Sequence, residues 1–192
     1  RVLFRSTEGL HYGVIKTPEK FWLRWKEPCG EPCKPSRFTA EEYPNELDRS
    51  VLQFFDPVRL LEYIHDFIIF DGGIKKAARP NQYFAVKAAQ PRICKKQNGI
   101  IWHSQGSGKS LTMIWLARWI RENVSDARVV IITDRDELDK QIESGFKDAG
   151  EQIQRAKSGG KLIKMLNAAE PWLICTLIHK FGNKNDGDAI SV

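Results

Sequence analysis

Seven consecutive residues near the middle of the chain have the types and spacing of a phosphate-binding loop. They are Ser104-Gln105-Gly106-Ser107-Gly108-Lys109-Ser110. The two glycines permit positive φ, which turns successive backbone N–H groups toward an anion. Lys109 is expected to reach the β- and γ-phosphates of a nucleoside triphosphate, and the Ser110 hydroxyl to bind Mg²⁺. The segment therefore predicts a triphosphate and Mg²⁺ site in which Lys109 and Ser110 do the catalytic work.

One position departs from the strict pattern for such loops. The pattern Gly-x-x-x-x-Gly-Lys-Ser/Thr requires glycine at position 103, where this chain has His103. The remaining Gly-x-Gly-Lys-Ser lies between an apolar run and a helical pattern, which is the context that the motif requires. A glycine-rich turn without a ligand is the alternative interpretation.

The elements around the loop predict an α/β fold with a parallel sheet. Continuous apolar runs are typical of strands buried on both faces, and they occur at residues 99–103, 128–133 and 171–176. Helical spacing of apolar residues occurs at residues 110–123, at Leu138, Ile142 and Phe146, and at Leu162, Ile163 and Leu166. Strands that alternate with helices favour right-handed crossovers in one sheet.

The part of the chain before the loop is predicted to be helical and to follow a linker. Residues 26–46 are rich in proline and charge, so we place a linker and a domain boundary there. Asp56-Pro57 is a helix start, and apolar residues at helical spacing extend that helix toward Asp71-Gly72-Gly73. A second helix is expected from Pro80 to Ala89. Residues 1–6 resemble a translated adapter and are expected to be a non-native leader.

Charge and cysteine content narrow the classes of partner. The formal net charge is +6, and no Asp or Glu occurs between Asp71 and Glu122. A basic segment of this kind suits a polyanion such as triphosphate or nucleic acid, although a solvated basic face is the simpler interpretation. Cys29 and Cys33 have no second close Cys or His pair, which disfavours zinc. With no secretion signal or apolar run long enough for a membrane helix, we expect a cytoplasmic protein.

Several motifs in sequence order resemble the restriction subunit of type I restriction-modification enzymes, which are superfamily 2 ATP-dependent DNA translocases and endonucleases. Residues 102–113 (Trp-His-Ser-Gln-Gly-Ser-Gly-Lys-Ser-Leu-Thr-Met) resemble the first motor motif of that family. Residues 130–141 resemble the next motif, and residues 176–181 the one after it. Residues 79–86 resemble the segment that recognises adenine through a glutamine. The resemblance extends over about residues 51–181.

The resemblance implies a domain plan and a set of partners. Residues 98–192 would be the first part of a RecA-like P-loop motor domain that stops before the Asp-Glu-x-His motif, and residues 51–97 a helical segment with the glutamine motif. Residues 7–50 would be the tail of a nuclease domain with its linker. The parent would hydrolyse ATP to translocate double-stranded DNA and cut it, together with methyltransferase and specificity subunits. This fragment alone is expected to bind ATP without turning it over.

The resemblance also implies roles for individual residues. Gln82 would hydrogen-bond the adenine edge, which makes the nucleotide ATP. The DNA backbone would lie against residues at the carboxyl ends of two strands, namely Thr133, Arg135, Thr176 and Lys180. For Thr133 a cap on the following helix is an equally good interpretation.

Three other functions fit parts of the sequence. Another superfamily 2 DNA or RNA helicase is the nearest alternative. A small-molecule kinase with the same loop would need an acceptor pocket and a lid within one domain. A non-catalytic interaction module with a vestigial loop would bind ATP no better than its Lys109→Ala variant.

Overall fold

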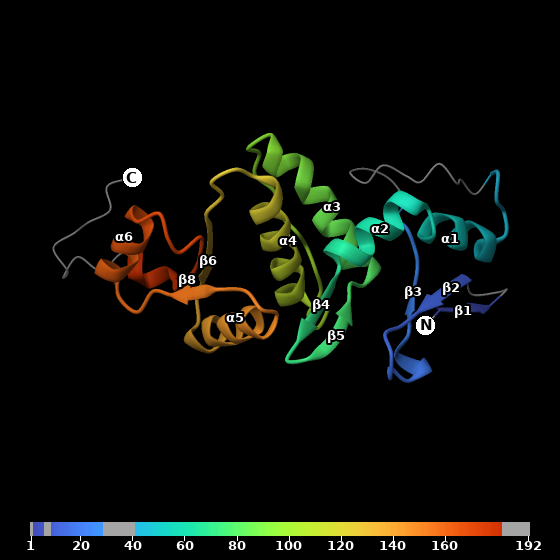
Figure 1. The fold of residues 1–192 in the computed structure, drawn as a ribbon, viewed down its shortest axis with the longest axis horizontal. Helices are drawn as coiled ribbons and strands as arrows, with labels where there is room; N and C mark the ends of the chain where they lie inside the picture. Colours follow the sequence, from blue (N-terminus) through green and yellow to red (C-terminus); the bar gives the residue numbers. More distant parts are fainter. Residues whose placement is uncertain (1, 6–8, 29–40, 182–192) are drawn as a thin grey trace. The chain divides into compact units, whose positions relative to one another are not determined.

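The computed structural model describes residues 2–5, 9–28 and 41–181 (Figure 1). The chain divides into two compact units. We call residues 1–69 with 74–116 the N-terminal unit, and residues 70–73 with 117–192 the C-terminal unit.

The N-terminal unit combines a small antiparallel sheet with three complete helices and the start of a fourth. Two of its helices begin at capping residues. The Asn45 side chain accepts from Leu47 N at 2.9 Å, and Asp56 precedes Pro57, which is the first residue of the next helix. The strands are β1 (Val2–Arg5), β2 (Gly9–Tyr12), β3 (Leu23–Arg24), the start of β4 (Ile68–Asp71) and β5 (Ile74–Ala77). The helices are α1 (Glu46–Phe54), α2 (Pro57–Asp66), α3 (Pro80–Cys94) and the start of α4 (Lys109–Asn123), with a short 3₁₀ turn at Glu19–Phe21. Strands β1, β2 and β3 pair in that order, and β4 pairs with β5.

An aromatic cluster forms the core of the N-terminal unit. The Trp25 ring is buried, and its centroid lies 4.9 Å from that of Phe54 and 5.4 Å from that of Phe84. Tyr12 and Tyr63 both donate their hydroxyl groups to the carbonyl oxygen of Ala78. Aromatic pairs of this kind stabilise beyond the area that they bury. Strands β2 and β3 are therefore packed on the same core as α1, α2 and α3.

The predicted linker and domain boundary fall mainly on residues outside the described part of the chain. Cys29 and Cys33 lie there as well. The assignment of residues 7–50 to the tail of a nuclease domain stays a prediction.

The prediction that the helix from Asp56 continues toward Asp71 was wrong. Helix α2 ends at Asp66, and residues 68–71 form strand β4 instead. Gly72 and Gly73 both have positive φ, 56° and 79°, and join β4 to β5 in a two-residue hairpin turn. Phe67 and Ile69 are buried while Phe70 is exposed, which is the alternation of a strand and not of a helix.

The C-terminal unit is an α/β unit with a parallel sheet, as the sequence predicts. Its sheet has the order β6-β8-β7, from β6 (Val129–Thr133), β7 (Ile153–Arg155) and β8 (Leu173–Leu177). Helices α5 (Asp136–Asp148) and α6 (Gly159–Asn167) connect the strands, and a 3₁₀ turn at Ile178–Phe181 follows β8. Every residue of the central strand β8 is buried. Strand β7 was not predicted, because a three-residue strand leaves no periodic pattern.

The two helices of this unit cover opposite faces of the sheet. Ile174 packs with Leu162 and Met165 of α6 in one buried cluster. The next residue, Cys175, is under the electrostatic influence of Asp139 and Glu143 of α5. Because successive side chains of a strand point to opposite faces, α6 and α5 lie on different sides of β8.

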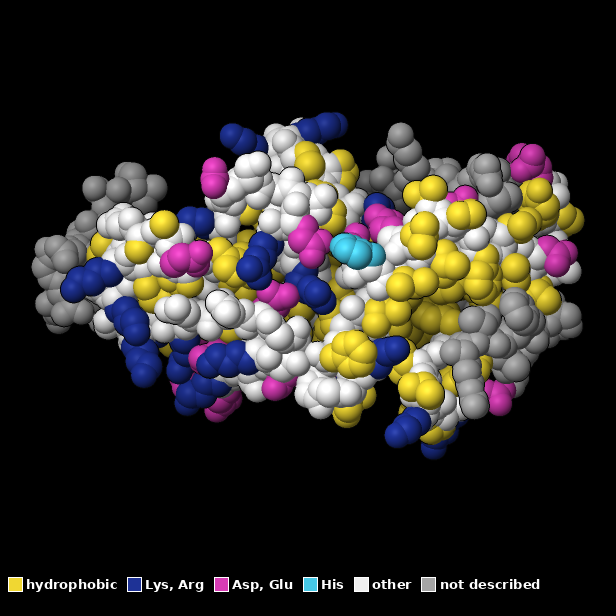
Figure 2. All heavy atoms as spheres, viewed as in Figure 1, with side chains coloured by type: hydrophobic (Ala, Val, Ile, Leu, Met, Phe, Trp, Pro, Cys, Tyr) yellow, Lys and Arg dark blue, Asp and Glu magenta, His cyan; other side chains and the backbone are white. Residues whose placement is uncertain are grey.

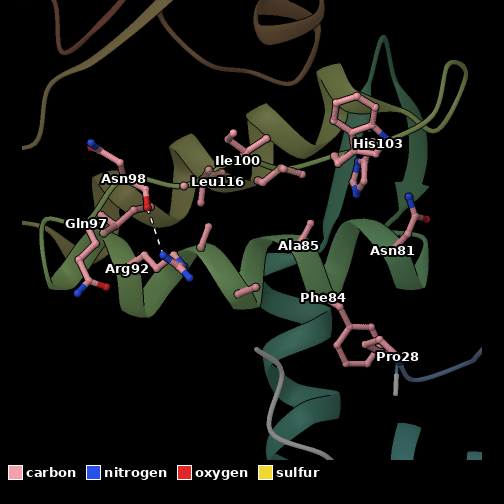
Figure 3. A pocket seen from close by; sticks show the side chains of 16 residues that line it. Pro28, Asn81, Phe84, Ala85, Arg92, Gln97, Asn98, Ile100, His103 and Leu116 are labelled. Carbon is pink, nitrogen blue, oxygen red and sulfur yellow. Dashed lines mark hydrogen bonds between the residues drawn. The ribbon is translucent and has the colours of Figure 1, made fainter. Parts of the chain in front are cut away.

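The predicted strand at residues 99–103 does not form. Ile100 and Trp102 are 90% and 91% exposed, and none of the strands in the described residues pairs with this segment. Figure 3 shows the segment beside α3, where Arg92 Nη1 donates to the Asn98 carbonyl oxygen at 3.3 Å. It borders a cavity of about 980 Å³ with the apolar side of α3. An apolar run shows that a segment is suited to burial, but a strand also needs a neighbour to pair with.

The surface carries apolar and charged regions on different elements. Helix α2 exposes Val58, Leu61 and Ile64, and Figure 2 shows hydrophobic side chains gathered over this part of the N-terminal unit. On α5, Lys140 pairs with Asp136 and Lys147 with Glu143. Among the described helices, none has the length and apolarity to cross a membrane.

We expect Cys175 to resist alkylation while Cys94 reacts. Burial raises the pKa of the Cys175 thiol to about 12, so at pH 8 it holds almost no thiolate, whereas Cys94 is exposed. Peptide mass spectrometry after iodoacetamide treatment reports both sites in one sample. Urea should remove the protection of Cys175. Equal rates at the two cysteines in the folded chain would contradict the buried position of β8.

Candidate nucleotide-binding site

The predicted phosphate loop forms a closed turn that leads directly into α4. Gly106 and Gly108 both have positive φ, 75° and 82°. Ser107 is buried, and its backbone N–H and its hydroxyl both donate to the Ser104 carbonyl oxygen, at 3.4 and 2.7 Å. The backbone therefore has the two positive-φ positions that a loop needs to turn N–H groups toward an anion.

Lys109 opens α4 and folds back over the loop. Its Nζ donates to the carbonyl oxygens of His103 and Ser104 at 3.3 and 3.0 Å. Within the described part of the chain, the ammonium group thus pairs with neutral carbonyl groups, which it could exchange for phosphate oxygens. Ser110 follows it, half-buried, in the first turn of α4. The positive end of the α4 dipole adds to the attraction for an anion at this point.

A cavity of about 470 Å³ lies over the loop. It is lined by Arg79, Asn81 and residues 102–107, which include Gln105, Gly106 and Ser107. Asn81 belongs to the start of α3, and Figure 3 shows that Asn81 and His103 both lie at the same end of the larger neighbouring cavity. The walls offer a guanidinium, an amide and backbone groups. This donor set suits phosphate.

Gln82 is joined to the loop by its side chain and lies outside the lining of that cavity. It is 2% exposed. Its Nε2 donates to the Gly108 carbonyl oxygen at 2.9 Å, and its Oε1 accepts from Arg79 N at 2.8 Å. The structure thus brings Gln82 to the phosphate loop, although the two lie 26 positions apart in sequence.

Gly108 is the one loop position where glycine is required by two separate features. Its φ is +82°, and a Cβ built there would lie 2.3 Å from Gln82 Nε2. At Gly106 the φ is also positive, but a Cβ would meet nothing within 4 Å. The close approach of the Gln82 amide is therefore a reason for glycine at position 108 that does not apply at position 106.

The four predicted DNA-contact residues lie in the C-terminal unit, in different environments. Thr133 ends β6 and is buried, with its hydroxyl 3.5 Å from Asp139 Oδ1. Thr176 is fully buried in β8. The Arg135 side chain is 79% exposed beside Asp134. Lys180 Nζ donates to the Ala156 carbonyl oxygen. Of the four, Arg135 has the side chain that solvent reaches most freely.

Arg155, at the carboxyl end of β7, fixes the position of α5 against the sheet, and no local pattern in the sequence marks it. It donates through Nε to Asp139 and through Nη2 to Asp136, so it clamps the first turn of α5 to β7. Asp139 is fully buried, which makes this ion pair its main compensation for lost solvent. The two carboxylates at i and i+3 were visible in the sequence. Their partner on a three-residue strand was not.

A comparison with protein families matches residues 81–191 to a model described as SWI2/SNF2 ATPase. That range is more than half of the 192 residues. The chain belongs to the SWI2/SNF2 ATPase family. The matched residues 81–191 include the predicted phosphate loop, Gln82 and the whole parallel sheet.

Individual relatives confirm the resemblance to type I restriction subunits. The chain is 32% identical over 151 residues to a provisionally named type I restriction enzyme MjaIXP endonuclease subunit of Methanocaldococcus jannaschii, over 72% of this chain and 14% of the relative. It is 30% identical to a type I restriction enzyme endonuclease subunit of Staphylococcus aureus strain COL, over 76% and 16%. It is 29% identical to the HindI endonuclease subunit of Haemophilus influenzae, over 62% and 14%. The SWI2/SNF2 ATPase chain spans about one-seventh of the length of these curated relatives.

Alanine at position 108 should cost more stability than alanine at position 106. Both substitutions place an L residue at positive φ, which costs roughly 1–2 kcal/mol. Only Gly108→Ala also drives a Cβ into Gln82, so we expect a total loss above about 2 kcal/mol. Urea unfolding followed through the fluorescence of buried Trp25 and Trp115 measures the difference. An equal loss in the two variants would rule out the close contact.

The C-terminal unit should lose stability in acid through Asp136. Hydrogen bonds from Lys140, and then from Arg155, hold the pKa of Asp136 below its ordinary value of 3.8. A carboxyl whose pKa is lower in the folded state stabilises the fold above its unfolded pKa, and that contribution is lost as the pH falls through the folded pKa. The unfolding free energy should therefore decrease as the pH is lowered below about 4.

Arg155→Met tests this assignment. It should reduce the acid dependence only in part, because the hydrogen bond from Lys140 to Asp136 remains. By leaving Asp139 buried without its ion pair, it should destabilise the unit at pH 7 by about 3 kcal/mol. Lys147→Met is the matched control, since Lys147 lies on α5, the helix that carries Asp136 and Asp139, and pairs with Glu143. Urea unfolding between pH 2.5 and 7 measures all three proteins. An unchanged acid slope in Arg155→Met would refute the role of the clamp.

Proposed function

We propose that this chain is the ATP-binding portion of the restriction subunit of a type I restriction enzyme. The parent couples ATP hydrolysis to translocation and endonucleolytic cleavage of double-stranded DNA, and works with methyltransferase and specificity subunits in the cytoplasm. In this proposal the three-stranded sheet is part of a RecA-like motor domain. Residues 7–50 are the tail of a nuclease domain and its linker.

The observation that carries the proposal is the geometry of Lys109 over the phosphate loop. Its ammonium lies against the carbonyl groups of His103 and Ser104, two residues that also line the cavity over the loop. The lining of that cavity includes the Arg79 guanidinium and no carboxylate among the described residues. Membership of an ATPase family and similarity to restriction subunits support ATP as the nucleotide and DNA as the polymer.

The residues present fit a triphosphate with Mg²⁺. The N–H groups of residues 105–109 would surround the β-phosphate, and Lys109 would bridge the β- and γ-phosphates. The Ser110 hydroxyl would be a ligand of Mg²⁺, which when bound neutralises charge on the transferring phosphate. Lys109 and Ser110 are thus the catalytic residues that this chain contributes.

The DNA backbone is proposed to lie at the carboxyl ends of β6 and β8. Parallel strands end at a common edge, and ligands of open α/β sheets gather there. Arg135 is the exposed cation at this edge. Thr133, Thr176 and Lys180 lie at the same edge but are buried or paired, so their part in contacting phosphate would need a local rearrangement.

Lys109→Ala should weaken ATP·Mg binding at least tenfold, because it removes the charge-assisted hydrogen bonds to two phosphates. Isothermal titration calorimetry of the full chain measures the affinity. Lys95→Ala is the control, since Lys95 is an exposed cation beyond the end of α3 and makes no contact with the loop. Equal affinity in wild type and Lys109→Ala would contradict the proposal.

The rate of ATP hydrolysis should distinguish this chain from the proposed parent protein. We expect no sustained phosphate release by this chain with duplex DNA present, since none of the described residues that line the cavity over the loop carries a carboxylate that could complete a Mg²⁺ site. Sustained turnover that depends on Lys109 would show that the chain is a complete motor site and not a portion of one.

A further inference from the structure

The Gln82 side chain uses both ends of its amide inside the protein. Oε1 accepts from the backbone N–H of Arg79 and caps the start of α3. Nε2 donates to the carbonyl oxygen of Gly108 in the phosphate loop. With only 2% of its surface exposed, Gln82 connects one helix start to the loop before another helix.

The Gly108 carbonyl oxygen receives three donors. Besides Gln82 Nε2 at 2.9 Å, it accepts from Thr112 N at 3.1 Å and from Thr112 Oγ1 at 3.3 Å. The Thr112 donors come from α4 itself and the Gln82 donor comes from α3. The direction of this carbonyl is therefore fixed from two helices.

Fixing that carbonyl also fixes the N–H of Lys109. The carbonyl group of residue 108 and the N–H of residue 109 belong to one planar trans peptide, in which they point in opposite directions. When the oxygen is held toward Gln82, the Lys109 N–H must face away from α3. In a phosphate loop that N–H is one of the donors to the anion.

We propose that Gln82 is a positioning residue of the phosphate loop, which orients the Gly108–Lys109 peptide for phosphate and acts independently of the nucleobase. This rests on the proposed function, because it assumes that the loop binds a triphosphate. It differs from the adenine contact that the family resemblance implies for Gln82. Arg79 and Asn81, which precede Gln82 at the start of α3, line the cavity over the loop, and Gln82 does not line it.

The glycine at position 108 agrees with this role. A side chain there would occupy the place of the Gln82 amide, at 2.3 Å from Nε2. The loop thus has a glycine where a neighbouring amide must approach its backbone. Gly106, where nothing approaches, needs glycine for its φ alone.

The test compares ligands with and without a base. Isothermal titration calorimetry of the full chain with Mg²⁺ measures inorganic tripolyphosphate, ATP and GTP against wild type, Gln82→Met and Gln82→Glu. Gln82→Met removes both hydrogen bonds at similar volume. Gln82→Glu keeps the acceptor for Arg79 N and removes the donor to Gly108, so it preserves the helix cap. Gln154→Met, at an exposed position of β7, is the matched control.

Each variant should weaken tripolyphosphate, ATP and GTP by a factor that is the same for the three ligands, roughly three- to tenfold where only the hydrogen bond to Gly108 is lost, as in Gln82→Glu. The ratio of ATP to GTP affinity should stay at its wild-type value. In Gln82→Glu the loss should shrink as the pH falls, with wild type as the reference at each pH, because a protonated carboxyl regains a donor for the Gly108 oxygen. A purely structural role would not produce that pH profile.

Two results would overturn the inference. If the variants weaken ATP while tripolyphosphate binds as in wild type, Gln82 contacts the base and does not position the loop. If Gln82→Glu binds all three ligands as wild type does, the hydrogen bond from Gln82 Nε2 to the Gly108 carbonyl oxygen does not affect phosphate binding. A wild-type chain that binds none of the three ligands in a Lys109-dependent way would instead overturn the proposed function itself.

Discussion

The structure of the candidate site depends on one backbone carbonyl, that of Gly108. Thr112 of α4 and Gln82 of α3 donate to it. Because the peptide is planar, these hydrogen bonds also fix the direction of Lys109 N–H.

The aromatic core connects this carbonyl to the rest of the N-terminal unit. Tyr83 and Phe84 follow Gln82 on α3 and pack against Trp25, while Trp115 of α4 packs near Phe67. The core places two helices, and the helices place the loop.

The C-terminal unit has a comparable constraint in Arg155. A fully buried carboxylate such as Asp139 is costly unless it is paired, and Arg155 supplies the pair from the neighbouring strand. The same guanidinium binds Asp136 in the first turn of α5, where negative charge also meets the positive end of the helix dipole. This clamp sets where α5 begins relative to the ends of the strands. Arg135, at the N-cap of α5, is consequently presented to solvent.

The sequence predicted the parts of the structure that local chemistry determines. Gly106, Gly108 and Lys109 form the loop as their conformational freedom and charge require, and α3 starts at Pro80 as a proline at the first helical position indicates. The parallel sheet followed from β6 and β8, whose apolar runs are long enough to recognise.

Predictions were wrong where pairing with another segment of the chain decides the secondary structure. Residues 68–71 pair with β5 and become a strand, whereas residues 99–103 have no strand to pair with among the described residues. Gln82 and Arg155 act through residues 26 and 16 positions away, which no local pattern reveals.

The loop is held mainly from its helical side. Gly108 is fixed by α3 and α4, while Ser104 is held by the turn from Ser107 and by Lys109 Nζ. All of these contacts come from residues within the N-terminal unit, and none requires the sheet of the C-terminal unit. The loop is therefore held by contacts within one unit of a chain that spans about one-seventh of its relatives' length. Binding of phosphate needs a shaped backbone and one cation, which two helices and a turn can supply. Hydrolysis needs carboxylates brought from further strands, so the two activities depend on different amounts of the fold.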